Sequence, residues 1–199
     1  MFRPKHPARF LVVVLAALAA ACASQKEPAD KALAELEGSL AKISEQAEKY
    51  MPEEYEEVSA QLAGLKSSYD AGDYKTVVTS APKAAAAIRK LQADAIIAKA
   101  EYAKQMTEEW GAMASAIPEQ IAAVDKQIVR HTSRGSTPKG LNRDEFKQLV
   151  ASFDAAKEAW AKAGESGNAG EHEAAVMAAR EVKQVIDSTM QALGMSSAG

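Results

Sequence analysis

The sequence predicts an all-α protein, an elongated antiparallel bundle of about six helices arranged as two related helical hairpins. Three observations support this fold class. Apolar residues recur at alternating intervals of three and four, which is the period of one helix face. Alanine occupies 43 of the 199 positions, whereas aromatic residues make up only 6%. We find no segment whose alternation is convincing for a β-strand.

Six apolar stripes follow one another along the chain, and each predicts one helix. They cover residues 33–50, 55–69, 77–102, 117–128, 146–160 and 176–193. A stripe of this kind makes a helix amphipathic, so its apolar face must be buried against other helices. We therefore expect a helical bundle over residues 31–195 and a disordered tail over residues 196–199.

Helix starts are indicated by prolines and by capping residues. Pro52 and Pro118 each fit a first helical position, where the missing N–H costs nothing. Asn142 and Asn168 each precede a glutamate by three residues, which is the pattern of a capping box. Pro82 is expected either to kink the third helix or to mark its true start.

Helix ends are indicated by glycines. Gly72 and Gly164 each fall just past an apolar stripe. A glycine at that place adopts the left-handed conformation that ends many helices. Both positions therefore predict a turn between two helices.

An internal repeat relates residues 54–91 to residues 145–189. The two segments match at an offset of 91 residues before the turn and 98 residues after it, so the second turn is expected to be seven residues longer. Neither hairpin can bury its stripe alone, so the hairpins should pack on each other or on neighbouring helices. Chance similarity between two amphipathic hairpins is the alternative interpretation.

The N-terminus has the layout of a secretory signal peptide over residues 1–21. Arg3, Lys5 and Arg9 precede an apolar run of 12 residues from Phe10 to Ala21. That run is too short for a transmembrane helix, which needs about 20 residues. An uncleaved membrane anchor is the alternative.

The only cysteine, Cys22, directly follows this segment. The sequence Leu-Ala-Ala-Ala-Cys resembles a bacterial lipobox, although Ala19 stands where that motif prefers leucine. The resemblance implies cleavage before Cys22 and lipid, such as palmitate, on its thiol, with residues 22–30 as a lipidated tether. It also implies the outer membrane, facing the periplasm. Ordinary signal-peptidase cleavage, giving a soluble periplasmic or secreted protein, is the alternative.

The first hairpin also resembles a family of bacterial envelope lipoproteins of unknown function. The resemblance covers residues 30–105 and is based on a Met51-Pro52 helix break, a Gly72-Asp73-Tyr74 turn and the alanine run from Ala84 to Ala87. It implies three helices separated by that break and that turn. The family more often has Ala-Pro where this chain has Met-Pro.

Charge and residue inventory exclude several classes of function. The net charge is −3, and without the signal peptide the chain has 21 basic and 27 acidic residues, a net charge of −6. This balance argues against nucleic acid as a partner. One cysteine excludes a multi-cysteine zinc site. We find no haem, phosphate-loop or nucleophile-elbow motif, and therefore predict no enzyme activity, no catalytic residues, no metal and no cofactor.

One loop, residues 131–141, stands out by its composition. It holds two glycines, a proline, several hydroxyl residues and the basic Arg134 and Lys139. Such composition is typical of a solvated connector. The alternative interpretation is a basic surface for an anionic partner.

Two functions remain open at the level of sequence. The first is a lipid-anchored, non-enzymatic scaffold or protein-binding module in the cell envelope, which has an envelope protein as its partner. The second is a periplasmic bundle that binds a small apolar or anionic ligand near Tyr102, Met106, Trp110 and Met113. Trp110 and Trp160 are otherwise expected to be core or interface anchors.

Overall fold

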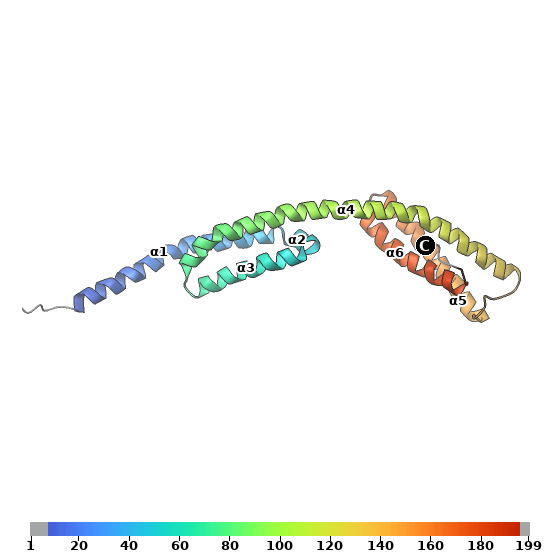
Figure 1. Cartoon of the computed structure of the whole chain (residues 1–199), viewed down its shortest axis with the longest axis horizontal. Coiled ribbons are helices and arrows are strands. Elements are labelled where there is room, and N and C mark those ends of the chain that lie inside the picture. The colour runs from blue at the N-terminus through green and yellow to red at the C-terminus, as the bar shows by residue number, and fades with distance from the viewer. Residues whose placement is uncertain (1–7, 196–199) are drawn as a thin grey trace, which may run out of the picture. The chain divides into compact units, whose positions relative to one another are not determined.

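The computed structural model describes residues 8–195, with side chains from residue 25 onward (Figure 1). Over this range the chain is all-α, with helices packed antiparallel and no strand, which confirms the predicted fold class. The helices of the described range are α1 (Ala8–Ala41), α2 (Ser44–Tyr50), α3 (Pro52–Asp70), α4 (Tyr74–Ser133), α5 (Arg143–Asn168) and α6 (His172–Ala192). Among residues 25–195, whose side chains the structure describes, no helix combines the length and the apolar character needed to cross a membrane.

The chain divides into two compact units, unit 1 (Met1–Ala100) and unit 2 (Glu101–Gly199). Helix α4 contributes residues 74–100 to unit 1 and residues 101–133 to unit 2. Each unit buries its own apolar cluster, and neither cluster contains residues of the other unit. The two units therefore have separate hydrophobic cores.

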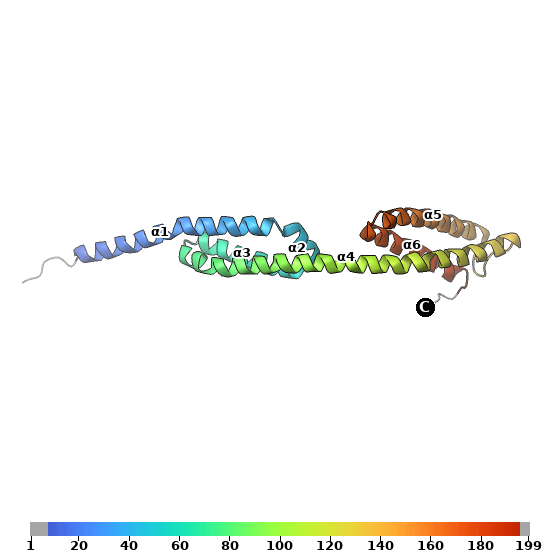
Figure 2. The same ribbon diagram turned by 90° about the horizontal axis from the view of Figure 1, so that it is seen from above.

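Unit 1 is built from α1, α2, α3 and the first part of α4, which lie side by side in both views (Figures 1 and 2). Its core consists of the apolar stripes predicted from the sequence. The buried residues include Leu33, Leu36, Leu40, Ala47, Val58, Leu62, Leu65, Val77, Ala81, Ala84, Ile88, Leu91 and Ala95. Alanine is frequent on the α4 side of this core.

Unit 2 is built from the second part of α4 together with α5 and α6 (Figure 2). Its core again consists of the predicted stripes. The buried residues include Ile117, Val124, Ile128, Phe146, Phe153, Ala156, Ala179, Val182, Ile186 and Leu193. The spacing of three and four therefore placed nearly every large core residue of both units correctly.

Helix α4 is continuous, so the expected helix start at Pro118 was wrong, as was one of the two alternatives given for Pro82; the other alternative, a kink, stays a prediction. Pro118 does not begin a helix, and Pro82 does not mark a helix start, because both lie inside α4. An interior proline removes one helical hydrogen bond at a cost of about 3 kcal/mol. Burial of a side chain such as Val77 or Ile88 contributes about 1.5–3 kcal/mol, so two of them offset that loss. Both prolines are exposed.

The first predicted stripe is divided between two helices. Helix α1 ends at Ala41 and α2 begins at Ser44, with a turn in which the Ile43 N–H donates to the Leu40 carbonyl at 3.1 Å. Ile43 nevertheless stays in the core of unit 1. The chain therefore passes from α1 to α2 through a turn, and its apolar stripe stays buried across that turn.

Residues 25–30, which belong to the expected tether, are part of α1. Ala29 is fully buried in the core of unit 1. The hydroxyl of Tyr69 on α3 donates a hydrogen bond to the Asp30 carboxylate, and Lys26 pairs with the same carboxylate at 3.6 Å. Among the residues with described side chains, Ala29 is the first that is buried, and it lies seven positions after Cys22.

The predicted helix starts at Pro52 and Asn142 are confirmed. Pro52 is the first residue of α3. The Asn142 side chain accepts hydrogen bonds from the Asp144 and Glu145 N–H groups at 2.9 Å each, and the Glu145 carboxylate accepts from the Asn142 N–H at 2.7 Å. This reciprocal pair is a complete capping box for α5.

The expected boundaries at Asn168 and Gly164 were wrong. Gly164 lies inside α5, and Asn168 is the last residue of that helix and caps nothing. The N-cap of α6 is Glu171, whose side chain makes no capping hydrogen bond. The glycine that ends α5 is Gly170, at a φ of 82°.

The two hairpin turns have the same backbone geometry. In the first turn Gly72 has a φ of 79°, and the Asp73 N–H donates to the Ser68 carbonyl at 2.9 Å. In the second turn the Glu171 N–H donates to the Ser166 carbonyl at 2.9 Å. Both are glycine-terminated turns that satisfy the last helical carbonyls. Every residue named in the first turn has its equivalent 98 positions later in the second turn.

The seven extra residues of the second hairpin therefore lie in a helix and not in the turn. Helix α3 has 19 residues and α5 has 26. Seven residues are close to two helical turns of 3.6 residues each. The insertion lengthens α5 and leaves its apolar face in the same direction.

We expect Asn142→Ala to lower the free energy of unfolding of unit 2 by about 1 kcal/mol, because the α5 cap is lost. Asn168→Ala is the matched control and should have no unfavourable effect, since its side chain caps no helix. Urea unfolding followed by tryptophan fluorescence reports unit 2, because both tryptophans lie there. Equal losses in the two variants would contradict this assignment.

Candidate functional site

Cys22, the predicted lipidation residue, lies outside the residues whose side chains the structure describes. Its modification therefore stays a prediction. What is described around it begins at Gln25 and leads directly into the packed part of α1.

The residues of the expected ligand site lie where α4 meets α5 and α6 in unit 2. Arg180 of α6 forms a two-point ion pair with Glu109 of α4, with nitrogen–oxygen distances of 2.7 and 2.6 Å. Thr107 Oγ1 lies 2.8 Å from His172 Nδ1, and the Tyr102 hydroxyl donates to Glu173 at 3.1 Å. These three polar contacts fasten α6 along α4.

Trp110 occupies the centre of this junction. Its indole lies against Gly167 of α5, so closely that a Cβ atom at position 167 would overlap the ring. The ring of Trp160 lies 5.4 Å from that of Trp110, with the planes inclined by 33°. Gly167 therefore has a steric role, because only a residue without a side chain leaves room for the indole.

The prediction that tryptophans are packing anchors agrees with these contacts. Met106 is buried, and Met113 packs against the core of unit 2 together with Trp110. The cavities described below are not lined by these residues. A ligand at this position stays a prediction.

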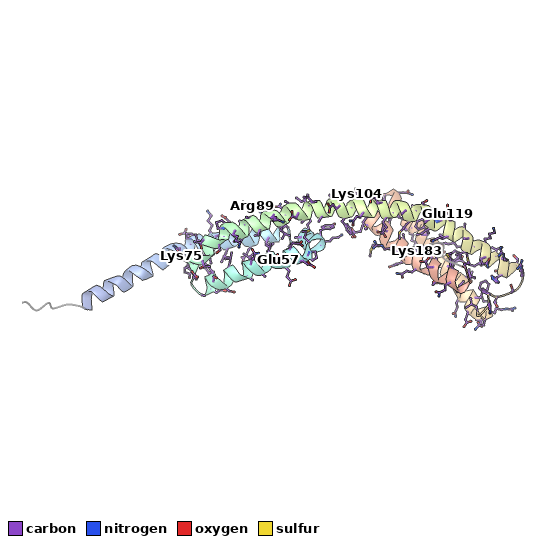
Figure 3. All side chains as sticks on the ribbon, in the orientation of Figure 1. Glu57, Lys75, Arg89, Lys104, Glu119 and Lys183 are labelled. Atoms are coloured by element: carbon purple, nitrogen blue, oxygen red, sulfur yellow. The ribbon has the colours of Figure 1, made fainter. Side chains whose placement is uncertain are left out.

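A groove of about 520 Å³ lies between α1 and α4 in unit 1. Its floor is apolar, its walls are short side chains, and its rim carries the charged Glu35 and Arg89, the latter labelled in Figure 3. The lining residues on α4 include Val78, Ala81, Pro82, Ala85 and Ile88. Short side chains leave the space between the two helices unfilled.

Pro82 adds a polar feature to this groove. Because proline has no N–H, the Val78 carbonyl four residues earlier lacks its helical donor. Val78 lines the same groove.

A second groove, of about 360 Å³, lies between α3 and α4. It is lined by small and polar residues, among them Gly64, Ser68, Ser80 and Lys83. Helix α4 of unit 1 is thus flanked by a groove on each side, and the first of them is the larger.

A third cavity, of about 350 Å³, is formed by the loop that was singled out in the sequence and by the start of α5. Its lining combines loop hydroxyls, two cations and an apolar wall. The lining residues are Thr132, Gly135, Ser136, Thr137, Arg143, Phe146, Lys147 and Val150. We call it the loop pocket.

Metal-binding geometry is absent from the part of the chain with described side chains, where no three His, Cys, Asp or Glu residues are grouped. His131 lies 6.0 Å from the Phe146 ring, edge to face, and His172 contacts Thr107. The two histidines thus have separate packing partners within unit 2.

No protein-family model, curated protein or solved structure matches this chain at a significant level. The resemblance to envelope lipoproteins over residues 30–105 therefore stays a prediction.

Sequence reasoning missed the role of Gly167 and the pairing of Glu109 with Arg180. Nothing in the local pattern marks Gly167, because its environment comes from a different helix. A signal for the ion pair does exist, since Tyr102 and Glu109 are seven residues apart, as are Glu173 and Arg180. Polar residues that repeat after seven positions lie on the same side of a helix. Such a repeat beside the apolar stripe of both α4 and α6 indicates that these two faces contact each other.

We expect Gly167→Ala to lower the free energy of unfolding of unit 2 by about 1–3 kcal/mol, because the new methyl group forces Trp110 to move. Gly164→Ala, one turn earlier in α5, has open space around the new atom and should raise stability by about 0.5–1 kcal/mol. Urea unfolding followed by tryptophan fluorescence measures both. Changes of the same sign would contradict this packing.

The Glu109–Arg180 pair predicts a pH dependence. Hydrogen bonds from Arg180 lower the pKa of the Glu109 carboxyl below its ordinary value of 4.5. A depressed folded-state pKa stabilises the fold above the unfolded-state value, and this contribution is lost as pH falls through the folded-state pKa. We expect Glu109→Gln to cost up to about 1 kcal/mol at pH 7 and nothing at pH 2.

The control for this pair is Glu108→Gln, whose carboxylate is 68% exposed and 3.8 Å from Lys104. It should change stability little at either pH. Chemical unfolding of both variants at pH 7 and pH 2 makes the comparison. A Glu109→Gln effect that is equal at the two pH values would show that the carboxylate contributes nothing through its charge.

Proposed function

We propose that this chain is a lipid-anchored protein of the bacterial cell envelope that acts as a non-enzymatic helical scaffold or protein-binding module. The groove between α1 and α4 in unit 1 is the observation that supports binding most directly. Its lining comes from two helices and combines apolar residues with the charged Glu35 and Arg89. These are the features of a site for an amphipathic helix of a partner protein.

The chemistry of the groove suits a helical partner for two reasons. Short residues such as Ala81 and Ala85 let a partner helix approach closely, while Leu36 and Ile88 offer apolar surface. Glu35 and Arg89 carry opposite charges at the rim, which would orient a charged partner.

The anchor places this groove near the membrane. The buried Ala29 lies seven positions after Cys22, and seven positions span at most about 25 Å when fully extended. Lipid chains at about 0.8 kcal/mol per buried CH₂ would hold the protein firmly. Unit 1 would then present its groove close to the lipid surface that carries the anchor.

Binding of a small anionic ligand is a second candidate function, and the loop pocket favours it. The pocket brings Arg143 and Lys147 together with loop hydroxyls in unit 2. It is independent of the groove in unit 1, so the two functions do not exclude each other.

The anchor is tested by Cys22→Ala in cells fed a clickable palmitate analogue. We expect loss of label and loss of membrane fractionation, because the thiol is the attachment point, and globomycin should make the unmodified wild-type precursor accumulate. Ser24→Ala is the matched control and should stay labelled. Unchanged labelling of Cys22→Ala would refute the lipid anchor.

The groove is tested in the same cells with a photo-cross-linking amino acid at position 85 or 86. Ala85 lines the groove, whereas the neighbouring Ala86 is exposed and does not. We expect a discrete protein adduct from position 85 and none from position 86. Equal adducts from both positions, or none from either, would reject the groove as a protein-binding site.

A further inference from the structure

Five of the eight residues that line the loop pocket, from Thr132 to Arg143, belong to a segment whose charge is opposite to that of the rest of the chain. Between Asp125 and Asp144 the sequence contains five Lys or Arg residues and no Asp or Glu. Elsewhere from residue 22 onward the chain has 27 acidic and 16 basic residues. A positive region on an acidic protein attracts anions to that region selectively.

These cations are not neutralised by the protein. Other basic residues of unit 2, including Lys157 and Arg180, pair with carboxylates at 2.6–3.0 Å. Among the residues with described side chains, none of the five cations around the pocket has a carboxylate within ion-pair distance. They are Arg130, Arg134, Lys139 and Arg143 of that segment together with Lys147 of α5, which lines the pocket; Lys126, the fifth cation of the segment, is not counted among them. The nearby Glu145 carboxylate is engaged by the Asn142 N–H.

The two cations that line the pocket do not serve the helix on which they lie. Arg143 is the first residue of α5 and Lys147 follows one turn later. Positive charge near a helix N-terminus opposes the helix dipole and destabilises the helix. Asp144 and Glu145 already complement the dipole in the first turn, so α5 does not itself require cations at positions 143 and 147.

The first hairpin shows that the hairpin fold does not require these cations. At the offset of 91 residues, Pro52 is equivalent to Arg143 and Glu56 is equivalent to Lys147. Phe146, by contrast, is matched by the aromatic Tyr55. The packing residue is kept between the two hairpins while the two cations are specific to the second.

We propose that the loop pocket binds a phosphate group. Arg143 offers the planar pair of donors that fits phosphate oxygens, and Lys147 adds a second charge. Thr137 adds a loop hydroxyl to the lining, and so does Ser136, whose hydroxyl donates to the His131 carbonyl at 3.4 Å. A volume of about 350 Å³ exceeds that of phosphate alone, so the wall of Phe146 and Val150 receives the group to which the phosphate is attached.

The test is calorimetric titration of the full chain in a non-ionic detergent at fixed ionic strength. The two probes are inorganic phosphate and dihexanoylphosphatidic acid, which separate a free phosphate from a lipid headgroup. The pocket variant is Arg143→Gln/Lys147→Gln. The matched control is Lys126→Gln/Lys162→Gln, which removes the same charge from α4 and α5 at positions that do not line the pocket.

We expect saturable binding of at least one probe, and at least fivefold weaker binding by the pocket variant than by the control. Binding of inorganic phosphate identifies a soluble phosphate as sufficient, whereas binding of the lipid alone identifies a headgroup. No saturation by either probe up to about 10 mM, or a difference of less than fivefold between the variants, would overturn the proposal.

Correct folding of the variants is checked by circular dichroism and tryptophan fluorescence. If the pocket variant does not fold, Ser136→Ala/Thr137→Ala provides the same test, because it removes only loop hydroxyls, and Ser133→Ala is its control. The site lies in unit 2 and does not depend on Cys22 or on the groove in unit 1. Failure of the phosphate titration therefore leaves the anchor and groove experiments to be decided separately.

Discussion

The structure depends on the burial of one narrow apolar stripe on each helix. With few aromatic residues and many alanines, no helix has enough apolar surface on more than one face to tolerate rotation. Each unit therefore stays packed only while the spacing of three and four is kept in register. This constraint explains why α4 runs through Pro82 and Pro118: breaking the helix would misalign buried residues on both sides.

Much of the fold follows from that spacing, and the elements that do not follow from it have identifiable causes. The stripes located the core residues of both units, and Asn142 located a helix start. Local signals failed where tertiary packing outweighed them. Gly164 carries the local signal of a helix end, but Ala163 and Gly167 are buried on either side of it, so the helix continues to Asn168.

The functional features were predictable to unequal degrees. The composition of residues 131–141 indicated a solvated connector, with a basic surface as the alternative interpretation, and the structure adds the cavity and the participation of Arg143 and Lys147 from the next helix. The groove in unit 1 was not predictable, because it arises from what short side chains on two separate helices leave unfilled. The position of Cys22 indicated lipidation from the sequence, and the structure contributes the short distance in residues from Cys22 to the buried Ala29.

The seven-residue difference between α3 and α5 has a consequence for how this architecture tolerates changes of length. Adding or removing seven residues changes a helix by roughly 10 Å while the faces on both sides keep their direction. Adding five would rotate the following face by roughly 140° and turn its apolar stripe toward water. Insertions and deletions within these hairpins are therefore tolerated best in steps of about seven residues. The helices of one hairpin can then be longer than those of the other while the turn between them keeps the same backbone geometry.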